Sequence, residues 1–336
     1  MTDTILQNPY AAILRAIWSI IVAIAQSTAN TLNIRWLTSF SQVNQHENNT
    51  IPDGGAANPT GLLHPDCRNG GAGMKHVIMY SSGIGSWATA KQVIAKHGVE
   101  NIILLFADTQ IEDEDNYRFL EESANSLGCQ LVKVADGRDP WEIFEDKRWL
   151  GNSRIAQCSH LLKQQPCLQW LKQFDPEHKA TLYVGIDWTE LHRLKAIQKH
   201  WQPWKVEAPL TEPPYLDKLQ VLEKAKEEGL EPPRLYKYHF AHANCGGFCV
   251  RAGQAHFANL LKHFPERYRH HEAKEQELRQ FLGKEVAILR EQHNREKQPL
   301  TLTKLRERIE SRSYQLDLFD WGGCGCFTAD VEVSDE

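Results

Sequence analysis

Six small residues between an apolar run and a helical pattern have the composition of an anion-binding loop. They are Ser81, Ser82, Gly83, Ile84, Gly85 and Ser86. Residues 77–80 before them predict a buried strand, and residues 87–97 after them predict a helix with Ser86 as its N-cap. Backbone amides at a helix N-terminus favour negative charge, and glycine lets the backbone approach a phosphate closely. The spacing indicates a nucleotide phosphate loop, although an ordinary strand-to-helix turn has the same composition.

A cysteine pair near the end of the chain's central region is the second candidate site. Cys245 and Cys249 are separated by three residues, two of them glycine, so both thiolates can reach one metal ion. Cys324 or Cys326 could contribute a further thiolate. A set of four thiolates suits either Zn²⁺ or an iron–sulfur cluster, whereas cysteines without such a role are small buried hydrophobes.

Alternating strand and helix patterns must position these residues. Further predicted strands are 101–107, 130–134 and 181–186, and further predicted helices are 116–127, 215–228 and 253–263. Asp108 follows the most apolar strand, and ligands bind at the carboxyl ends of strands in open parallel sheets. Glu190 and Arg193 follow the last strand in the same way.

Composition divides the chain into three parts and excludes several classes of protein. We predict an N-terminal extension over 1–73 with a short helix at 9–26, an α/β domain over 74–265, and a charged helical extension with a cysteine-containing tail over 266–336. The apolar run in the extension is too short and interrupted for a membrane span, and it lacks the features of a signal peptide. Met74 precedes the first convincing strand, so the working protein could begin there.

The net charge of -5 argues against a generally basic nucleic-acid binder. Eight cysteines in 336 residues do not make a disulfide scaffold, so the default location is the reducing cytoplasm, with no membrane partner. The stretch 266–312 carries charges of both signs and predicts a solvated helical pair, with His270 and His271 exposed to solvent.

Five blocks in this order resemble the phosphoadenosine phosphosulfate reductase-like branch of the adenine nucleotide α-hydrolase superfamily, the PP-loop ATP pyrophosphatases. The blocks are 81–86, 107–109 with the acidic residues after it, 158–163 with Pro166, 185–190 with Arg193, and 244–249. No block is specific alone, because strings of the SGGxDS type are short. Their order and spacing over about 74–255 carry the resemblance.

The resemblance implies an α/β fold: a doubly wound, Rossmann-like parallel sheet with helices on both faces and a helical C-terminal extension. The phosphates of ATP or an adenylyl-sulfate would be held by Ser81, Ser82, Gly83, Gly85 and Ser86. Asp108 would lie beside the adenosine or a phosphate-bound Mg²⁺, Glu190 would belong to the nucleotide site, and Arg193 with Lys163 would neutralise anionic charge. Cys158 lies where relatives often place a third cysteine, and some sulfur-transferring relatives carry 4Fe–4S clusters.

Two departures from the family pattern bear on the reaction. Ser82 replaces the usual first glycine of the loop, and Gly85 replaces the usual aspartate. The chain also ends in a Cys324-Gly-Cys326 string rather than the Glu-Cys-Gly type of sulfonucleotide reductases. We therefore expect an enzyme that adenylates an acceptor or transfers sulfur, with a nucleic acid or a sulfur donor as partner. The alternatives are a non-catalytic nucleotide sensor, a sulfonucleotide reductase and a structural zinc protein.

Overall fold

The computed structural model describes residues 73–152, 155–293 and 296–311. All the described residues belong to one compact unit. The predicted helix at 9–26 and the predicted tail site at Cys324 and Cys326 lie outside the described residues. Among the helices that are described, none combines the length and the apolar character needed to span a membrane.

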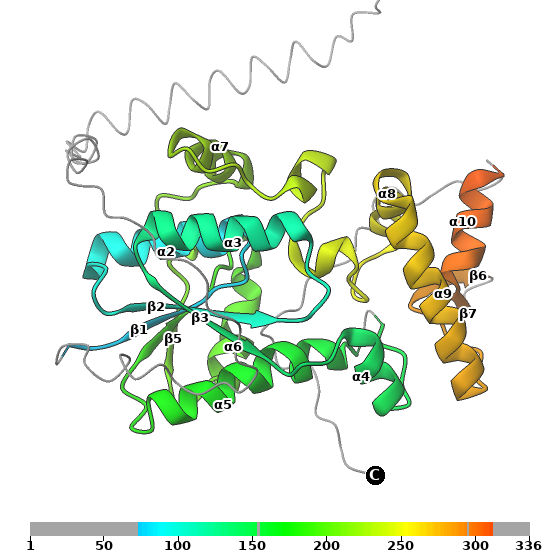
Figure 1. Cartoon of the computed structure of the whole chain (residues 1–336), viewed down its shortest axis with the longest axis horizontal. Coiled ribbons are helices and arrows are strands. Elements are labelled where there is room, and N and C mark those ends of the chain that lie inside the picture. The colour runs from blue at the N-terminus through cyan, green and yellow to red at the C-terminus, as the bar shows by residue number, and fades with distance from the viewer. Residues whose placement is uncertain (1–72, 153–154, 294–295, 312–336) are drawn as a thin grey trace, which may run out of the picture. The chain divides into compact units, whose positions relative to one another are not determined.

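A five-stranded parallel sheet forms the centre of this unit (Figure 1). Its strands are β1 (His76–Met79), β2 (Ile102–Asp108), β3 (Gln130–Ala135), β4 (Thr181–Tyr183) and β5 (Lys205–Glu207). They follow the order β3-β2-β1-β4-β5, and each neighbouring pair is parallel. The chain winds outward from β1 in both directions, which confirms the predicted doubly wound fold. The order reverses between β1 and β4, the place where open sheets of this kind bind ligands.

Helices cover both faces of the sheet because its central strands are apolar on both sides. On one face, α2 (Ile84–His97), α3 (Glu114–Leu127) and α7 (Lys218–Glu227) bury a cluster that includes Ile78, Leu104 and Trp87. On the other face, α5 (Gln165–Phe174) and α6 (Leu194–His200) pack on Val77, Leu105 and their neighbours. The two clusters hold the loops at the carboxyl edge of the sheet in place.

The start of α2 differs from the prediction. The N-cap is Gly83 rather than Ser86, and the helix begins at Ile84. The Ser86 hydroxyl donates a hydrogen bond of 2.8 Å to the carbonyl of Gly83, so it acts from inside the first turn. The helix therefore begins inside the predicted phosphate loop, which brings its first amides directly to the loop.

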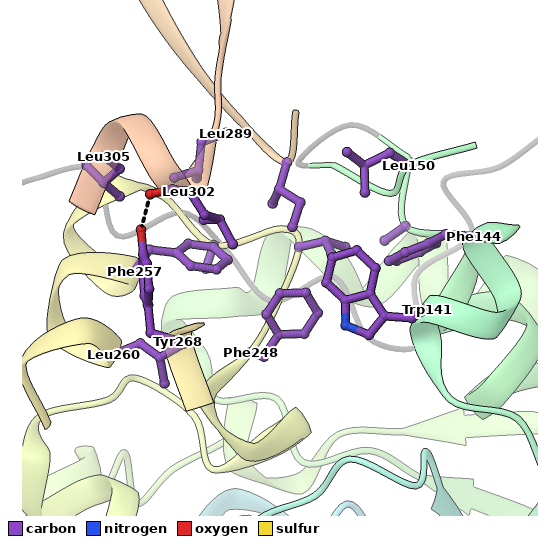
Figure 2. Close-up of a cluster of buried hydrophobic side chains, with 14 of the residues drawn as sticks. Trp141, Phe144, Leu150, Phe248, Phe257, Leu260, Tyr268, Leu289, Leu302 and Leu305 are labelled. Carbon is purple, nitrogen blue, oxygen red and sulfur yellow. Dashed lines mark hydrogen bonds between the residues drawn. The ribbon is translucent and has the colours of Figure 1, made fainter. Parts of the chain in front are cut away.

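A third hydrophobic cluster joins the end of the sheet domain to the C-terminal elements (Figure 2). It contains Trp141 of α4 (Pro140–Asp146), Phe257 of α8 (Gln254–His263) and Tyr268 of α9 (Pro265–Leu282). Leu302 and Leu305 of α10 (Leu302–Glu310) complete it. The Tyr268 hydroxyl donates to the carbonyl of Leu302 at 2.7 Å, so α9 and α10 are joined by a buried hydrogen bond as well as by packing.

Residues 266–312 are not the predicted solvated helical pair. A β-hairpin of β6 (Leu289–His293) and β7 (Glu296–Leu300) separates α9 from α10. His271 is buried rather than solvated, because its ring stacks on Phe248 with centroids 3.7 Å apart and accepts a hydrogen bond from the Trp141 indole at 3.0 Å. Burial lowers the pKa of His271 to about 3. Because charged residues dominate the sequence of 266–312, its pattern does not reveal the apolar face that packs on the third cluster.

Candidate functional site

A pocket opens at the switch point of the sheet, where the loops after β1 and β4 meet. The phosphate loop and the start of α2 form one side, and the segment after β4 and the start of α7 form another. The lining comes from the phosphate loop, the segment after β4, the segments around α7 and residues 241–244. It includes Ser81, Gly83, Ile84, Gly85, Ser86, Gly185, Asp187, Glu190, Arg193, Leu216, Asp217, Lys218, Tyr236, His242 and Asn244. We call this the switch-point pocket.

Four of the five predicted phosphate-loop residues line this pocket: Ser81, Gly83, Gly85 and Ser86. Ser82 does not, because its buried hydroxyl donates to the carbonyl of Asn116 at 2.8 Å. The first amides of a helix lack intrahelical acceptors. In α2 the first of them, the N–H of Ile84, donates to the Tyr236 hydroxyl at 3.1 Å. The pocket therefore has a helix N-terminus at one wall, as an anion site requires.

The two glycine-containing walls touch through their backbones. A Cβ atom on Gly85 would lie 2.8 Å from the carbonyl oxygen of Gly185, and one on Gly185 would lie 2.8 Å from the amide nitrogen of Ser86. Real Cβ contacts are not this short, so neither position accommodates a side chain without a backbone shift. This contact accounts for Gly85 at the place where the family pattern has aspartate.

The wall that faces the loop carries charged side chains. Arg193 forms an ion pair with Glu190 one helical turn away. The Lys218 ammonium donates to the carbonyl of Ala241 at 2.7 Å. Asp187 is an N-cap and accepts from the amide of Thr189 at 2.8 Å. Of the predicted site residues, Glu190 and Arg193 thus line the same pocket as the phosphate loop.

Two predicted residues lie elsewhere. Asp108, at the end of β2, accepts hydrogen bonds from the Tyr117 hydroxyl at 2.6 Å and from the amide of Gln110 at 2.9 Å, and it is not among the residues that line the switch-point pocket. Lys163 belongs to a π-helical segment, Ser159–Gln164, and its ammonium lies 3.6 Å from a carboxylate oxygen of Glu112. Lys163 lines a second pocket instead.

That second pocket, the cysteine pocket, brings together three of the predicted metal ligands. Cys158, Cys245 and Cys249 line it, with Thr109, Phe248 and Lys163 also in its wall. Cys245 has a φ of 54°, and the two glycines after it also have positive φ, so a left-handed turn presents the thiol. Within the described ranges, no group of three or more His, Cys, Asp or Glu side chains has the arrangement of a metal site.

Glu112 ties the cysteine loop to the end of β2. Its buried carboxylate accepts from the amide of Cys245 at 2.5 Å and from the Thr109 hydroxyl at 3.0 Å, and it faces the Lys163 ammonium. Arg267 of α9 donates to the carbonyl of Gly246 at 2.5 Å from the other side. Loop, sheet edge and α9 therefore hold the left-handed turn in one conformation.

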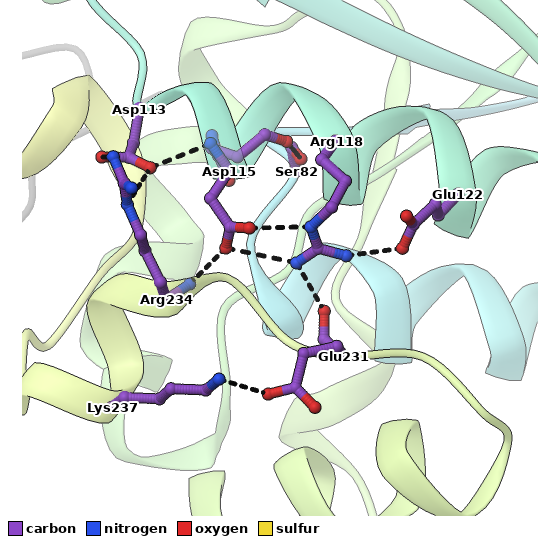
Figure 3. Close-up of polar contacts among 9 residues, drawn as sticks. Ser82, Asp113, Asp115, Arg118, Glu122, Glu231, Arg234 and Lys237 are labelled. Atoms are coloured by element: carbon purple, nitrogen blue, oxygen red, sulfur yellow. Dashed lines mark hydrogen bonds and ion pairs between the residues drawn. The ribbon is translucent and has the colours of Figure 1, made fainter.

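An ion-pair network fixes the segment that carries Tyr236 (Figure 3). Arg234 pairs with the buried carboxylate of Asp113 at 2.9 Å, and the amide of Arg234 donates to Asp115 at 2.5 Å. Arg118 donates to the carbonyl of Glu231 at 2.9 Å from α3. Because Asp113 is the N-cap of α3, the same residues hold the helix start and the Tyr236 segment together.

Sequence reasoning missed several residues that line the switch-point pocket, among them Tyr236, Lys218 and His242. None of them belongs to a block that resembles the family. Tyr236 comes from a segment that follows two prolines and has no periodic pattern, whereas Lys218 lies in the predicted helix 215–228 but outside every block. His242 lies three residues before Cys245, so its nearness to the cysteine block was the one available signal.

No protein-family model matches the chain, and no curated protein matches it. Among solved structures, it is similar to a phosphoadenylyl-sulfate reductase from Candida auris in a phosphate complex, with 16% identity and a TM-score of 0.37 over 50% of this chain and 78% of that chain. An NMN synthetase from Francisella tularensis has 14% identity and a TM-score of 0.32 over 47% of this chain and 63% of that chain.

An NH3-dependent NAD synthetase from Campylobacter jejuni has 13% identity and a TM-score of 0.32 over 65% of this chain and 90% of that chain. The strand order and the pocket at the switch point define the chain as a doubly wound α/β protein with a pocket at the carboxyl edge of its sheet.

Proposed function

We propose that this protein is an adenine-nucleotide-binding enzyme of the phosphoadenosine phosphosulfate reductase-like branch of the PP-loop superfamily. One observation supports the proposal above the others: the loop 81–86 and the N-terminus of α2 line the same pocket as Arg193 and Lys218. Phosphate groups would lie against the α2 amides, and the two cations would offset their charge. The reaction we favour is adenylation of an acceptor or transfer of sulfur, including sulfur modification of a nucleic acid.

The chain's own residues would bind and orient the nucleotide. The α2 N-terminus would hold the phosphates, and Arg193 would meet charge that develops on the phosphoryl oxygens when the bond between the α- and β-phosphates breaks. Mg²⁺ in such sites is held by substrate phosphates and one or two carboxylates. The pocket offers Asp187, Glu190 and Asp217 for that purpose, whereas Asp108 is not in its wall. Bound Mg²⁺ would supply further stabilisation of the phosphate charge.

Replacing Arg193 by alanine is expected to weaken ATP binding by about 10- to 100-fold, because a hydrogen bond between charged groups contributes about 1.5–3 kcal/mol. Isothermal titration calorimetry of the full chain with ATP measures the effect. Arg138→Ala is the matched control, since Arg138 pairs with Asp136 and Asp146 and does not line the pocket. Equal ATP affinity in the wild type and in Arg193→Ala would refute the assigned site.

A non-catalytic nucleotide sensor is the second candidate. The observation that favours it is the backbone contact between Gly85 and Gly185, which leaves no room for the aspartate usual in the family loop. Release of pyrophosphate from ATP, measured with and without candidate nucleic acids, separates the enzyme from the sensor. Supplying an adenylyl-sulfate in place of ATP, together with a dithiol as the two-electron reductant, tests the third candidate, a sulfonucleotide reductase, by release of sulfite.

We propose further that Cys158, Cys245 and Cys249 bind either a 4Fe–4S cluster or Zn²⁺, with Cys324 or Cys326 as the fourth ligand. The three described cysteines line one pocket without the arrangement of a preformed metal site, so a metal would have to draw them together, and thiolates suit either group. Protein purified without oxygen should carry iron and sulfide or zinc, and Cys245→Ser should lose that metal. The control is Cys129→Ser, because Cys129 lies outside the cysteine pocket. Metal-free wild-type protein, or full retention of metal in Cys245→Ser, would count against this site.

A further inference from the structure

His242 lies in the wall of the switch-point pocket together with Ser81 and Ser86 of the phosphate loop. Its ring is half-buried, and no hydrogen bond joins it to any residue in the described part of the chain. A histidine in such a wall usually contacts a carboxylate or a carbonyl group, which fixes its tautomer. His242 has neither contact, so its polar atoms are available to a ligand in the pocket.

The charges around His242 come from four different elements. Lys218 at the start of α7, Arg193 after β4 and Lys163 of the π-helical segment all act on its ring, as does His256 of α8. Burial is the largest effect and these charges follow, and together they lower the pKa of His242 to about 3. The ring is therefore neutral near pH 7 in the ligand-free protein, because burial and the nearby cations both disfavour its protonated form.

The carboxylates that line the same pocket already have partners of their own. Asp187 and Asp217 are N-caps and accept from backbone amides, and Glu190 pairs with Arg193. None of the three is among the strongest influences on the His242 ring. The wall of the pocket thus places Lys218 and Arg193 with a neutral imidazole that can accept a proton.

We propose that His242, Lys218 and Arg193 form an anion-binding subsite of the switch-point pocket, and that an anion bound there brings a proton to the His242 ring. This inference rests on the proposed nucleotide site and specifies its ligand. The nucleotide carries two anionic groups, one at the α2 N-terminus and one at His242. A bound anion offsets the cations that oppose protonation, and imidazolium then donates a charge-assisted hydrogen bond to it.

The proton comes from the solvent, so binding and protonation are thermodynamically linked. Lower pH therefore strengthens binding of the anion for as long as the ring of the free protein stays neutral. A ligand with a single anionic group satisfies only one of the two positions. The pocket should thus prefer ATP to AMP, and this preference should depend on His242.

Calorimetric titration of the full chain with ATP at pH 7, in two buffers of different ionisation enthalpy, measures the proton uptake. The wild type should take up between about a half and one proton more than His242→Gln, because ATP contributes the same proton exchange to both. His242→Gln should also lose most of the preference for ATP over AMP. His239→Asn is the control, since His239 is exposed on the same segment, has a φ of 62° that asparagine tolerates, and does not line the pocket.

The outcomes separate this inference from the proposed function. Tight ATP binding with equal proton uptake in the wild type and His242→Gln overturns the subsite and leaves the nucleotide site standing. Failure of the wild type to bind ATP overturns both. If His242→Gln does not fold, as judged by circular dichroism, His242→Asn supplies the same comparison with a shorter amide side chain.

Discussion

Replacing Glu112 by alanine is expected to lower the free energy of unfolding by about 3–5 kcal/mol, because it leaves a buried ammonium without its carboxylate. The Glu112 side chain is 2% exposed and that of Lys163 is 6% exposed, so water cannot take the place of the lost partner. The amide of Cys245 and the hydroxyl of Thr109 lose their acceptor at the same time. Urea denaturation of the two proteins measures the difference.

The matched control is Glu231→Ala. Glu231 also pairs with a lysine, Lys237, but both side chains are more than half exposed, so the loss should be under about 1 kcal/mol. The Glu112 variant should also show faster alkylation of Cys245, because the loop loses the bond that fixes its backbone. Similar stability losses in the two variants would show that Glu112 is not the buried centre of this junction.

Replacing Gly185 by alanine is expected to weaken ATP binding by at least about tenfold and to lower the free energy of unfolding by about 1–3 kcal/mol. The new Cβ would lie 2.8 Å from the Ser86 amide nitrogen and 2.9 Å from the carbonyl carbon of Gly85. Both are backbone atoms, so the start of α2 must move away from β4 to make room. Calorimetry with ATP and thermal denaturation measure the two effects.

A Cβ at Gly83 provides the comparison, since it would meet only the ends of two side chains, at 3.2 Å and 3.6 Å, and the φ of this residue is -94°. Gly83→Ala should therefore keep the stability of the wild type. Gly85→Asp restores the residue usual in the family loop, yet its Cβ would lie 2.8 Å from the Gly185 carbonyl oxygen, so we expect weaker rather than stronger ATP binding. Stronger binding in Gly85→Asp would show that the two backbones separate readily.

The sheet could be predicted from sequence because its strands are short, continuous apolar runs buried on both faces. Residues 102–108 illustrate this, since six of the seven are fully buried and the predicted strand differs from β2 by one residue at each end. The hairpin β6–β7 could not be predicted, because β7 is mostly exposed and its charged residues carry no alternating pattern. The burial of the His271 ring could not be predicted from the sequence, because it depends on contacts with Trp141 and Phe248, which are distant in sequence.

The candidate site, like the fold, contains residues that could be predicted from the sequence and residues that could not. The loop 81–86 was recognisable because a glycine-rich turn onto a helix is a local pattern, and Arg193 was recognisable from its block. The placement of Lys163 and Arg193 in two different pockets could not be predicted from the sequence. It depends on the ion-pair partner of each side chain, and the partner of Lys163 is Glu112. Tyr236 reaches the α2 N-terminus only because Arg234 and Arg118 fix its segment to α3.

The segment around Cys245 has a mechanical consequence. Asn244 lines the switch-point pocket and Cys245 lines the cysteine pocket, so adjacent residues face different chambers. The left-handed turn after them is held by Glu112 on one side and by Arg267 on the other. If a ligand displaces Asn244, the turn that follows stays fixed. The displacement would then reach the Cys245 thiol through the single peptide bond that joins Asn244 to Cys245.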